Sequence, residues 1–374
     1  MGEQKVYILL SETLDENTGI GKKILSQKEA LSKLFGYTNL IQVKELNGKL
    51  VRISEDTNYC YDLLPNNPIG KFLSYFKYDK ILKKAIENKV DIFYIRFTHF
   101  ANPFFISFLK KLKTHGIAVY LEIPTYPYDK EYDSVKLTSK LKLKMDQLFR
   151  NKIGKYVDKI ITYSDDSKIF GASCLNISNA VNNINLPVYN NKLEKVLNLI
   201  GVANLGPWHG YDRLINSLRL YDPSVNNNVR VIFHIVGDGE ELEKYKSMVK
   251  TLNLEKAIRF YGVLNGDNLN QVFEKAHIGV DSLGRHRSGN NYNNSLKSKE
   301  YIARGLPIIK SHIDNTIPEP LCWNVTPDDL DFDISDIVNW YVSSEFDSLE
   351  ISSFGKKEFT WQFQFQNIKT DYLK

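Results

Sequence analysis

The sequence predicts an α/β protein of two domains, each built on a parallel sheet covered by helices on both faces. Its 374 residues exceed one ordinary domain and suit two of about 150–200 residues each. Short apolar runs alternate with stretches of helical period along the chain, a pattern typical of parallel sheets. An Asn-rich stretch at 177–191, with Pro187 and no helical period, separates two such series and is the expected linker.

The elements follow from this alternation. In the first series, strands are expected at 6–10, 91–97, 118–123 and 159–163, and helices at 22–35, 104–114 and 134–153. In the second, strands are expected at 196–202, 229–236, 257–261, 277–281 and 307–309, and helices at 212–221, 240–252, 268–275 and 295–303. Ligands of parallel sheets bind at the carboxyl ends of the strands, so we expect the site in a cleft between the domains.

The composition narrows the class of protein. The chain is 43% hydrophobic and 25% charged, as expected of a soluble globular protein, and its formal charge of +5 is too mild to indicate nucleic acid. That charge suits a phosphate-bearing substrate or an anionic membrane surface. Three widely spaced cysteines argue against disulfides or zinc and favour a reducing, cytoplasmic compartment. No apolar run approaches 18 residues, and the initial one is read as a first strand rather than a signal peptide.

The segment from 279 to 309, GVDSLGRHRSGNNYNNSLKSKEYIARGLPII, carries the most chemistry. A buried strand leads into a polar loop, and a helix opens at Ser295, with Leu296 and Lys297 in its first turn. A helix N-terminus presents free N–H groups and a partial positive charge, which suit a pyrophosphate. Lys297 could neutralise phosphate, and Glu300, three residues on, could accept hydrogen bonds from ribose hydroxyls. Alternatively, Lys297 and Glu300 form a solvated pair on an amphipathic helix.

The run LKSKEYIARGLPII resembles the donor-site segment of glycosyltransferase family 4, retaining enzymes of the GT-B fold. In that family two Glu residues stand eight positions apart, and the second leads into a helix that ends in Gly-x-Pro. Glu300 matches the second Glu, whereas Tyr292 stands at the position of the first. The resemblance therefore places more weight on Asn293, Asn294, Ser295 and Lys297 for holding the sugar and its leaving phosphate.

Two further segments resemble the same family in the expected order. In IGVANLGPWHGYDRLINSL, Gly210 matches the Gly of a Lys-Gly pair that binds the diphosphate, His209 replaces the Lys, and Asn204 stands near the usual Arg. A neutral His and an Asn donate hydrogen bonds without a fixed charge. In FHIVGDGEELEKY, Gly237 begins a Gly-x-Gly turn between a strand and a helix, which is also an ordinary connection. Together the three segments span roughly 196–310.

The N-terminal half resembles the family less closely. A loop containing Gly19 and Gly21 follows the first strand; the family's glycine-rich loop here faces the cleft, and an ordinary βα turn is the alternative. It is not a P-loop, because the required Gly and Ser/Thr are absent. Glu122 and Arg96 end two strands where family members often carry His. Glu122 is a candidate to position the acceptor hydroxyl or take its proton, or else to pair with Arg96.

Three remaining segments complete the interpretation. The stretch 134–159 is rich in Lys with an apolar helical stripe, which fits either contact with anionic lipid or a core-facing helix with a solvated face. Asp331 and Asp333 form an Asp-x-Asp, but this motif opens a helix late in the chain, so no metal site is expected. Trp361, Phe365 and later apolar residues recur at helical spacing, and the last helix of the family crosses back to the N-terminal domain.

The resemblance implies a GT-B architecture of two Rossmann-like domains with a cleft between them. The expected domains are an acceptor domain at 1–185, a nucleotide-sugar donor domain at 186–355 and a crossover helix at 356–374. The implied reaction moves a hexose-type sugar from a UDP or GDP sugar to a hydroxyl of a glycan or lipid-linked acceptor, with retention and without a required cofactor. The setting would be surface-polysaccharide synthesis at the inner membrane face. A sugar-nucleotide epimerase and a catalytically silent binding subunit are the alternatives.

Overall fold

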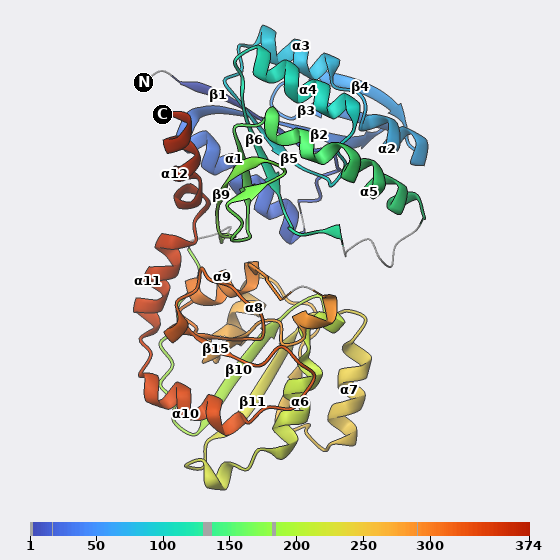
Figure 1. Ribbon diagram of the computed structural model, residues 1–374. Helices are drawn as coiled ribbons and strands as arrows, with labels where there is room; N and C mark the ends of the chain where they lie inside the picture. The colour runs from blue at the N-terminus through green and yellow to red at the C-terminus, as the bar shows by residue number, and fades with distance from the viewer. Residues whose placement is uncertain (1–2, 17, 130–136, 182–184, 290) are drawn as a thin grey trace. The chain divides into compact units, whose positions relative to one another are not determined.

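The computed structural model describes residues 3–16, 18–129, 137–181, 185–289 and 291–374 (Figure 1). The chain divides into two compact units. The N-terminal unit comprises Met1–Ser178 and Trp361–Lys374, and the C-terminal unit comprises Asn179–Thr360. Each unit has its own sheet and its own buried core. The prediction of a two-domain α/β chain is confirmed.

The sheet of the N-terminal unit has nine strands in the order β4-β3-β2-β1-β5-β6-β7-β9-β8. Strands β1, β2, β5, β6, β7 and β9 are parallel, whereas β3, β4 and β8 pair antiparallel. The antiparallel hairpins over residues 36–65 were not predicted. The strands are β1 (Gln4–Leu9), β2 (Gly36–Leu46), β3 (Lys49–Ser54), β4 (Cys60–Pro65), β5 (Ile92–Arg96), β6 (Ala118–Ile123), β7 (Lys159–Thr162), β8 (Lys168–Ile169) and β9 (Ala172–Asn176).

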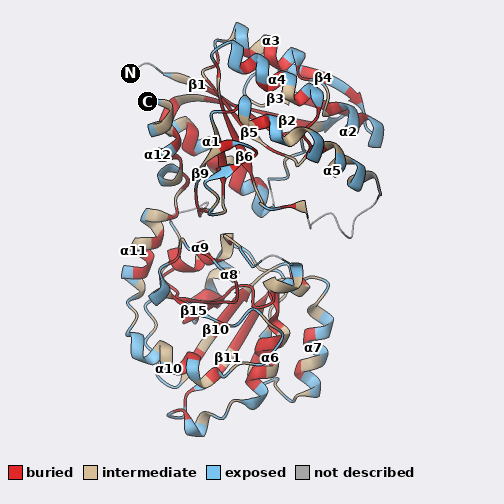
Figure 2. Ribbon diagram, viewed as in Figure 1, coloured by how far each residue is buried: buried red, intermediate tan, exposed pale blue. Residues whose placement is uncertain are grey.

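Helices cover both faces of this sheet (Figures 1 and 2). On one face lie α1 (Gly19–Phe35) and the C-terminal α12 (Trp361–Tyr372), where the Tyr120 hydroxyl donates to Asp371 at 3.0 Å. On the other lie α3 (Asp79–Glu87) and α4 (Pro103–Thr114), with the rings of Phe93 and Phe108 5.7 Å apart. Tyr94, the next residue along β5, has its ring 5.5 Å from that of Phe365 in α12, so successive residues of this strand face different helices, as strand geometry requires. The unit also contains α2 (Pro68–Ser74) and α5 (Leu137–Phe149).

Helix α5 is shorter than the predicted helix at 134–153. It ends at Phe149, and a 3-10 helix, Arg150–Lys155, follows. Residues 134–136 of the prediction lie outside the described residues. The prediction missed this break because Arg150 is drawn out of the helical pattern by a bidentate contact with Asp129, which is distant in sequence (2.8 and 3.0 Å).

The C-terminal unit has six parallel strands in the order β12-β11-β10-β13-β14-β15, the doubly wound 3-2-1-4-5-6 order. The strands are β10 (Val196–Val202), β11 (Arg230–Val236), β12 (Ile258–Phe260), β13 (Ile278–Val280), β14 (Ile308–Lys310) and β15 (Cys322–Asn324). The helices are α6 (Tyr211–Leu220), α7 (Leu242–Thr251), α8 (Gly266–Phe273), α9 (Leu296–Ala303), α10 (Ile334–Ser344) and α11 (Ser348–Glu358). Both sheets reverse their strand order beside the first strand, between β1 and β5 and between β10 and β13. These switch points are where ligands of such sheets bind.

Among the described residues, no helix is both long and apolar enough to cross a bilayer.

Candidate functional site

The loops that follow β10 and β13 meet at the switch point of the C-terminal unit. The Leu283 N–H donates to the His209 carbonyl at 2.8 Å, and the Gly284 N–H donates to the Trp208 carbonyl at 3.3 Å. Gly210 has φ of +61°, and a Cβ there would lie 2.3 Å from the Gly284 nitrogen. Only glycine fits this position, because a side chain would push the two loops apart.

A buried carboxylate, Asp281, lies directly after β13. Its Oδ1 accepts the Ser282 N–H at 2.8 Å and lies 3.0 Å from the Lys297 Nζ. Its Oδ2 accepts the Ser298 hydroxyl and lies 3.8 Å from His312 Nε2. Burial opposes ionisation of Asp281, but Lys297, His312 and Ser298 together hold its pKa well below its usual range. We call Asp281, Lys297, Ser298 and His312 the Asp281 cluster.

Lys297 occupies an unusual place in this cluster. It lies in the first turn of α9, where the helix dipole disfavours a cation. Its Nζ is buried, and although Asp281 pairs with it at 3.0 Å, no contact among the described residues has good hydrogen-bond geometry. A buried ammonium with donors to spare, beside a helix N-terminus, is suited to a second anion.

His209 adds a neutral donor. The Gly206 N–H donates to its Nδ1 at 3.0 Å, a shorter contact than the 3.3 Å from Nδ1 to the Gly206 carbonyl oxygen, and we therefore assign the ring proton to Nε2. Burial, reinforced by the nearby charge of Lys297, lowers the pKa of His209 to about 3. The imidazole is therefore neutral at physiological pH and offers an N–H without a charge.

The N-terminus of α9 is held in place by two contacts. The Ser295 hydroxyl caps the helix by accepting the Lys297 N–H at 3.2 Å, and Leu296 is the first helical residue. One residue earlier, the Asn294 side-chain oxygen accepts the Asn179 N–H at 2.8 Å. The cap at Ser295 lies where the sequence predicted the start of this helix.

Glu300 lies one turn further along α9. Its Oε1 accepts the Arg304 Nε–H at 3.0 Å, and its side chain remains 40% exposed. Arg304 also donates to Asn270 at 3.0 Å, which fixes the guanidinium. Glu300 thus has a fixed orientation and free acceptor capacity on the side exposed to solvent.

The other C-terminal candidates lie on neighbouring loops. Asn204 is exposed on the loop after β10. Gly237 follows β11, and its N–H donates to the Gly262 carbonyl at 2.7 Å. Arg287, a possible source of the positive charge that His209 does not supply, forms a bidentate pair with Asp212 at 2.9 and 3.0 Å. Its charge stabilises the loops rather than standing open to a ligand.

In the N-terminal unit, Glu122 and Arg96 lie side by side on paired strands. Glu122 Oε1 accepts from Arg96 at 2.9 Å and from the Tyr163 hydroxyl at 2.6 Å, and it lies 3.3 Å from the Lys23 Nζ. Burial opposes ionisation, yet Arg96 and Lys23 lower the pKa of Glu122 to about 2. Burial lowers the pKa of Lys23 to about 8, although Glu122 opposes that shift. We call Lys23, Arg96, Glu122 and Tyr163 the Glu122 cluster.

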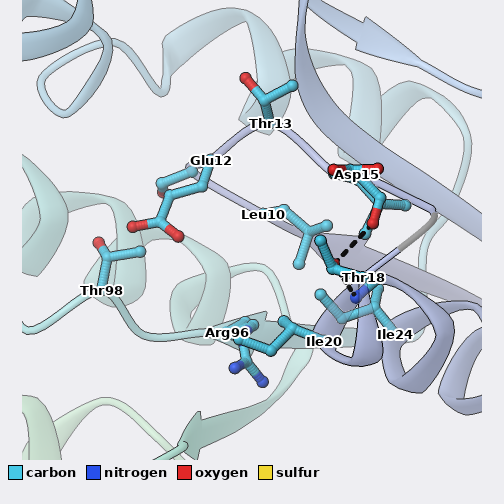
Figure 3. A pocket seen from close by; sticks show the side chains of 12 residues that line it. Leu10, Glu12, Thr13, Asp15, Thr18, Ile20, Ile24, Arg96 and Thr98 are labelled. Atoms are coloured by element: carbon cyan, nitrogen blue, oxygen red, sulfur yellow. Dashed lines mark hydrogen bonds between the residues drawn. The ribbon is translucent and has the colours of Figure 1, made fainter. Parts of the chain in front are cut away.

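A cavity of 260 Å³ lies at the switch point of this unit, between the loop after β1 and the end of β5 (Figure 3). Glu12, Thr18, Arg96 and Thr98 contribute polar groups to it. Gly21 also lines it, and a Cβ there would lie 1.9 Å from the Asp15 carbonyl oxygen, so the loop can fold onto α1 only at a glycine. Gly19, the first residue of α1, has open space around it.

Comparisons with known proteins fit this arrangement. Residues 188–322 match the family model described as "Glycosyl transferases group 1". Three solved structures resemble the chain: the lipopolysaccharide outer core galactosyltransferase WaaB (15% identity, 99% of each chain, TM-score 0.65), a glycosyltransferase from Rickettsia africae (12%, 100% of each, 0.61) and the pneumococcal O-GlcNAc transferase GtfA (9%, 100% of each, 0.56). No curated protein sequence matches the chain significantly.

The matched segment lies within the C-terminal unit and runs from before β10 to the start of β15. The structural likenesses, at such low identity, show the fold alone, and that fold is GT-B.

Sequence analysis missed three members of the Asp281 cluster, namely Asp281, Ser298 and His312. Asp281 itself carried a usable signal, because a carboxylate directly after a buried apolar strand lies at the ligand-binding edge of the sheet. His312 carried none, since only the pairing of β13 with β14 brings it beside Asp281.

The Asp-x-Asp of the same half caps a helix. The Asp333 carboxylate accepts the Ser335 N–H at 2.7 Å at the start of α10. Over the described part of the chain, no group of three or more His, Cys, Asp or Glu side chains could hold a metal ion.

Proposed function

We propose that the protein transfers a hexose-type sugar from a nucleoside diphosphate sugar to a hydroxyl of a glycan or lipid-linked acceptor, with retention of configuration. One observation carries the proposal: at the β10/β13 switch point, Lys297 lies in the first turn of α9, and its charge reaches the buried imidazole of His209 and adds to the lowering of its pKa by burial. A cation, a neutral donor and a helix dipole together suit a diphosphate.

In this proposal the donor's diphosphate lies on the first turn of α9, over Ser295 and Leu296. Lys297 moves from Asp281 toward the phosphate, and His209 donates from Nε2. As the bond from the anomeric carbon to the phosphate oxygen breaks, negative charge develops on the leaving diphosphate. Lys297 moves when the donor binds, so at the moment of reaction it, His209 and the N–H groups of α9 are already in place to stabilise that charge, and the reaction needs no metal ion in this account. The ribose hydroxyls donate to Glu300, which Arg304 holds in orientation.

Two of the structural neighbours support a uridine donor. The pneumococcal GtfA structure contains UDP and GlcNAc, and a structure of a Staphylococcus aureus TarM mutant contains UDP. We extend this to the present chain as a proposal and keep GDP sugars as the second choice. Other neighbours act in lipopolysaccharide synthesis. They support a role in surface-polysaccharide assembly at the inner membrane face.

For the acceptor we propose the cavity of the N-terminal unit. Arg96 lines that cavity, whereas Glu122 is fully buried behind it. Glu122 therefore acts through Arg96, which it orients by the 2.9 Å ion pair. We assign no protein nucleophile.

Product analysis with a donor labelled in the sugar tests the proposal. We expect label to appear on an acceptor hydroxyl with the anomeric configuration retained. An epimerised but free nucleotide sugar would contradict transfer and favour the epimerase.

A second candidate is a catalytically silent subunit that binds sugar nucleotides. The observation that favours it is the neutral His209, with its pKa lowered to about 3 by burial, where related enzymes place a lysine. This candidate predicts that donor binds normally in calorimetry while no acceptor in a broad panel gives turnover.

A further inference from the structure

An apolar groove of 670 Å³ lies on the N-terminal unit, between α2, α5 and the loop after β5. This size falls within the range of about 300–1,000 Å³ typical of small-molecule sites. Its apolar wall is formed by Ile69, Phe72, Tyr75, Phe100, Leu141 and Met145. Ile69 is 67% exposed and Leu141 is 59% exposed, so apolar surface stands open to solvent on both sides of the groove.

The groove also carries positive charge. The Lys142 Nζ lies 4.2 Å from the centre of the Tyr75 ring and 5.2 Å from that of Phe100, and Lys71 lies on the α2 side. None of the described residues that line the groove is acidic. Two lysines on an apolar channel complement an occupant that combines an apolar chain with an anionic group.

The groove continues toward the polar cavity described above. Thr98 lines the cavity and Phe100 lines the groove, and both belong to the loop after β5. Thr98 and Phe100 are two residues apart, about 7 Å of chain at most, so one elongated molecule can reach from the groove into the cavity. Burial raises the pKa of Tyr75, and the charge of Glu12, which lines the cavity, adds to that shift.

We infer that the groove binds the single alkyl or isoprenoid chain of a phosphate-bearing amphiphile, whose hydroxyl end enters the cavity beside Arg96 as the sugar acceptor. The part of this inference that concerns the acceptor rests on the proposed function; the binding of the amphiphile does not. The chain packs on Phe72, Phe100 and Leu141, and Lys142 and Lys71 neutralise the phosphate.

Two leucines of α5 allow an experiment that distinguishes a ligand-binding groove from a membrane-binding surface. Leu141 lines the groove, whereas Leu148 lies two helical turns further along the same face, is 72% exposed and does not line it. Leu141→Glu and Leu148→Glu make the same chemical change on one helix. A bilayer would be repelled by both changes, whereas an occupant of the groove would be repelled by the first alone.

The test is calorimetry with three ligands: decyl phosphate below its critical micelle concentration, butyl phosphate and inorganic phosphate. We expect the affinity to rise about twofold to fourfold for each added methylene, because burial of one methylene contributes up to about fourfold. Leu141→Glu should reduce decyl phosphate binding at least tenfold, and Leu148→Glu should leave it within twofold. Ile69→Glu, also exposed in the groove, should repeat the effect of Leu141→Glu.

Equal affinity for decyl and butyl phosphate would overturn the inference. So would equal loss in the Leu141 and Leu148 variants, with parallel loss of binding to anionic phosphatidylglycerol vesicles, since that outcome describes a membrane surface. The same samples are titrated with UDP and GDP. If the wild-type protein binds decyl phosphate but neither UDP nor GDP, the proposed function is contradicted and the groove is supported. If it binds a nucleotide normally but not decyl phosphate, only the inference about the groove is contradicted.

Discussion

Each unit buries a carboxylate near the carboxyl end of a parallel strand, Glu122 in β6 and Asp281 after β13, and the two are used differently. Four donors or cations approach a single oxygen of Glu122, and they come from α1, β5 and the segment after β7. The partners of Asp281 include the first turn of one helix, and one of them, Lys297, keeps donors to spare. The first carboxylate joins elements of the fold, and the second holds a cation ready for a ligand.

The comparison shows that burial and a shifted pKa do not by themselves mark the reacting groups. Both carboxylates have a lowered pKa because cations beside them outweigh burial. The two carboxylates differ in their partners. Lys297, the partner of Asp281, keeps N–H groups available for a ligand beside a helix N-terminus at the switch point.

The largest effect should come from removing the Glu122 charge. Glu122→Gln leaves Lys23 and Arg96 buried without their counter-ion, so we expect a loss of about 3–5 kcal/mol in the unfolding free energy. Denaturant unfolding measures it. Glu87→Gln, which removes a half-exposed carboxylate paired with Lys84 at 3.2 Å, should change stability by less than about 0.5 kcal/mol. An equal change in the unfolding free energy for the two substitutions would contradict the role of Glu122 in holding α1, β5 and the segment after β7 together.

Acid should weaken the two units unequally. Burial lowers the pKa of His209 to about 3 and those of His234 and His277 to about 4, and it also lowers that of His312, all in the C-terminal unit. In the N-terminal unit, burial lowers the pKa of His99 to about 4.

A histidine side chain in the unfolded chain binds a proton below a pH of about 6.5. In the folded protein these histidines stay neutral until the pH approaches 3 or 4. Their stabilisation is therefore present above pH 6.5 and is lost as pH falls. At pH 5.5 each costs about 1 kcal/mol, so the protection factors measured by hydrogen exchange, corrected for the intrinsic rate at each pH, should fall more in the C-terminal unit. An equal fall in both units would contradict this assignment.

Loss of the Lys297 charge should weaken donor binding. Lys297→Met removes a charge-assisted contact to the diphosphate, and we expect the Kd to rise about 10- to 100-fold in calorimetry. Lys246→Met on α7, where the lysine is exposed and pairs with Glu243 at 2.8 Å, is the control and should leave the Kd unchanged. If both variants bind alike, the Asp281 cluster is not the diphosphate site.

The smallest effect should come from His209. His209→Ala removes a neutral N–H, worth about threefold to tenfold in Kd. Because its pKa is near 3, the wild-type imidazole stays neutral, and its contribution to donor binding should be constant from pH 5 to 8. A His209-dependent gain in affinity below pH 7 would show that the imidazole is charged when donor binds. His115→Ala on the N-terminal unit serves as the unrelated histidine.

Local signals predicted the C-terminal unit well. The β10 bounds agree residue for residue, and α9 begins at its Ser295 cap, because each depends on a short apolar run or a cap close in sequence. The hairpins β2 to β4 were missed, although Asn47-Gly48, the two-residue turn between β2 and β3 with φ of +50° and +71°, is a local hairpin signal.

The site was predictable only in part. Ser295, Lys297 and Glu300 share one helix, so spacing alone placed them together. The pairing of Lys297 with Asp281, and of Glu122 with Lys23, joins residues far apart in the chain and depends on strand order. Whether a lysine keeps an open donor is decided by these distant partners, which no local pattern encodes.

Hydrogen exchange with and without nucleotide tests the central claim most directly. The nucleotide for this experiment is whichever of UDP, GDP and ADP raises the melting temperature of the protein most. We predict slower exchange in peptides spanning 204–210 and 293–300, where the loop after β10 and the first turn of α9 donate to the diphosphate. Slower exchange confined to the loop after β1, or no change at α9, would contradict a donor site at the Asp281 cluster.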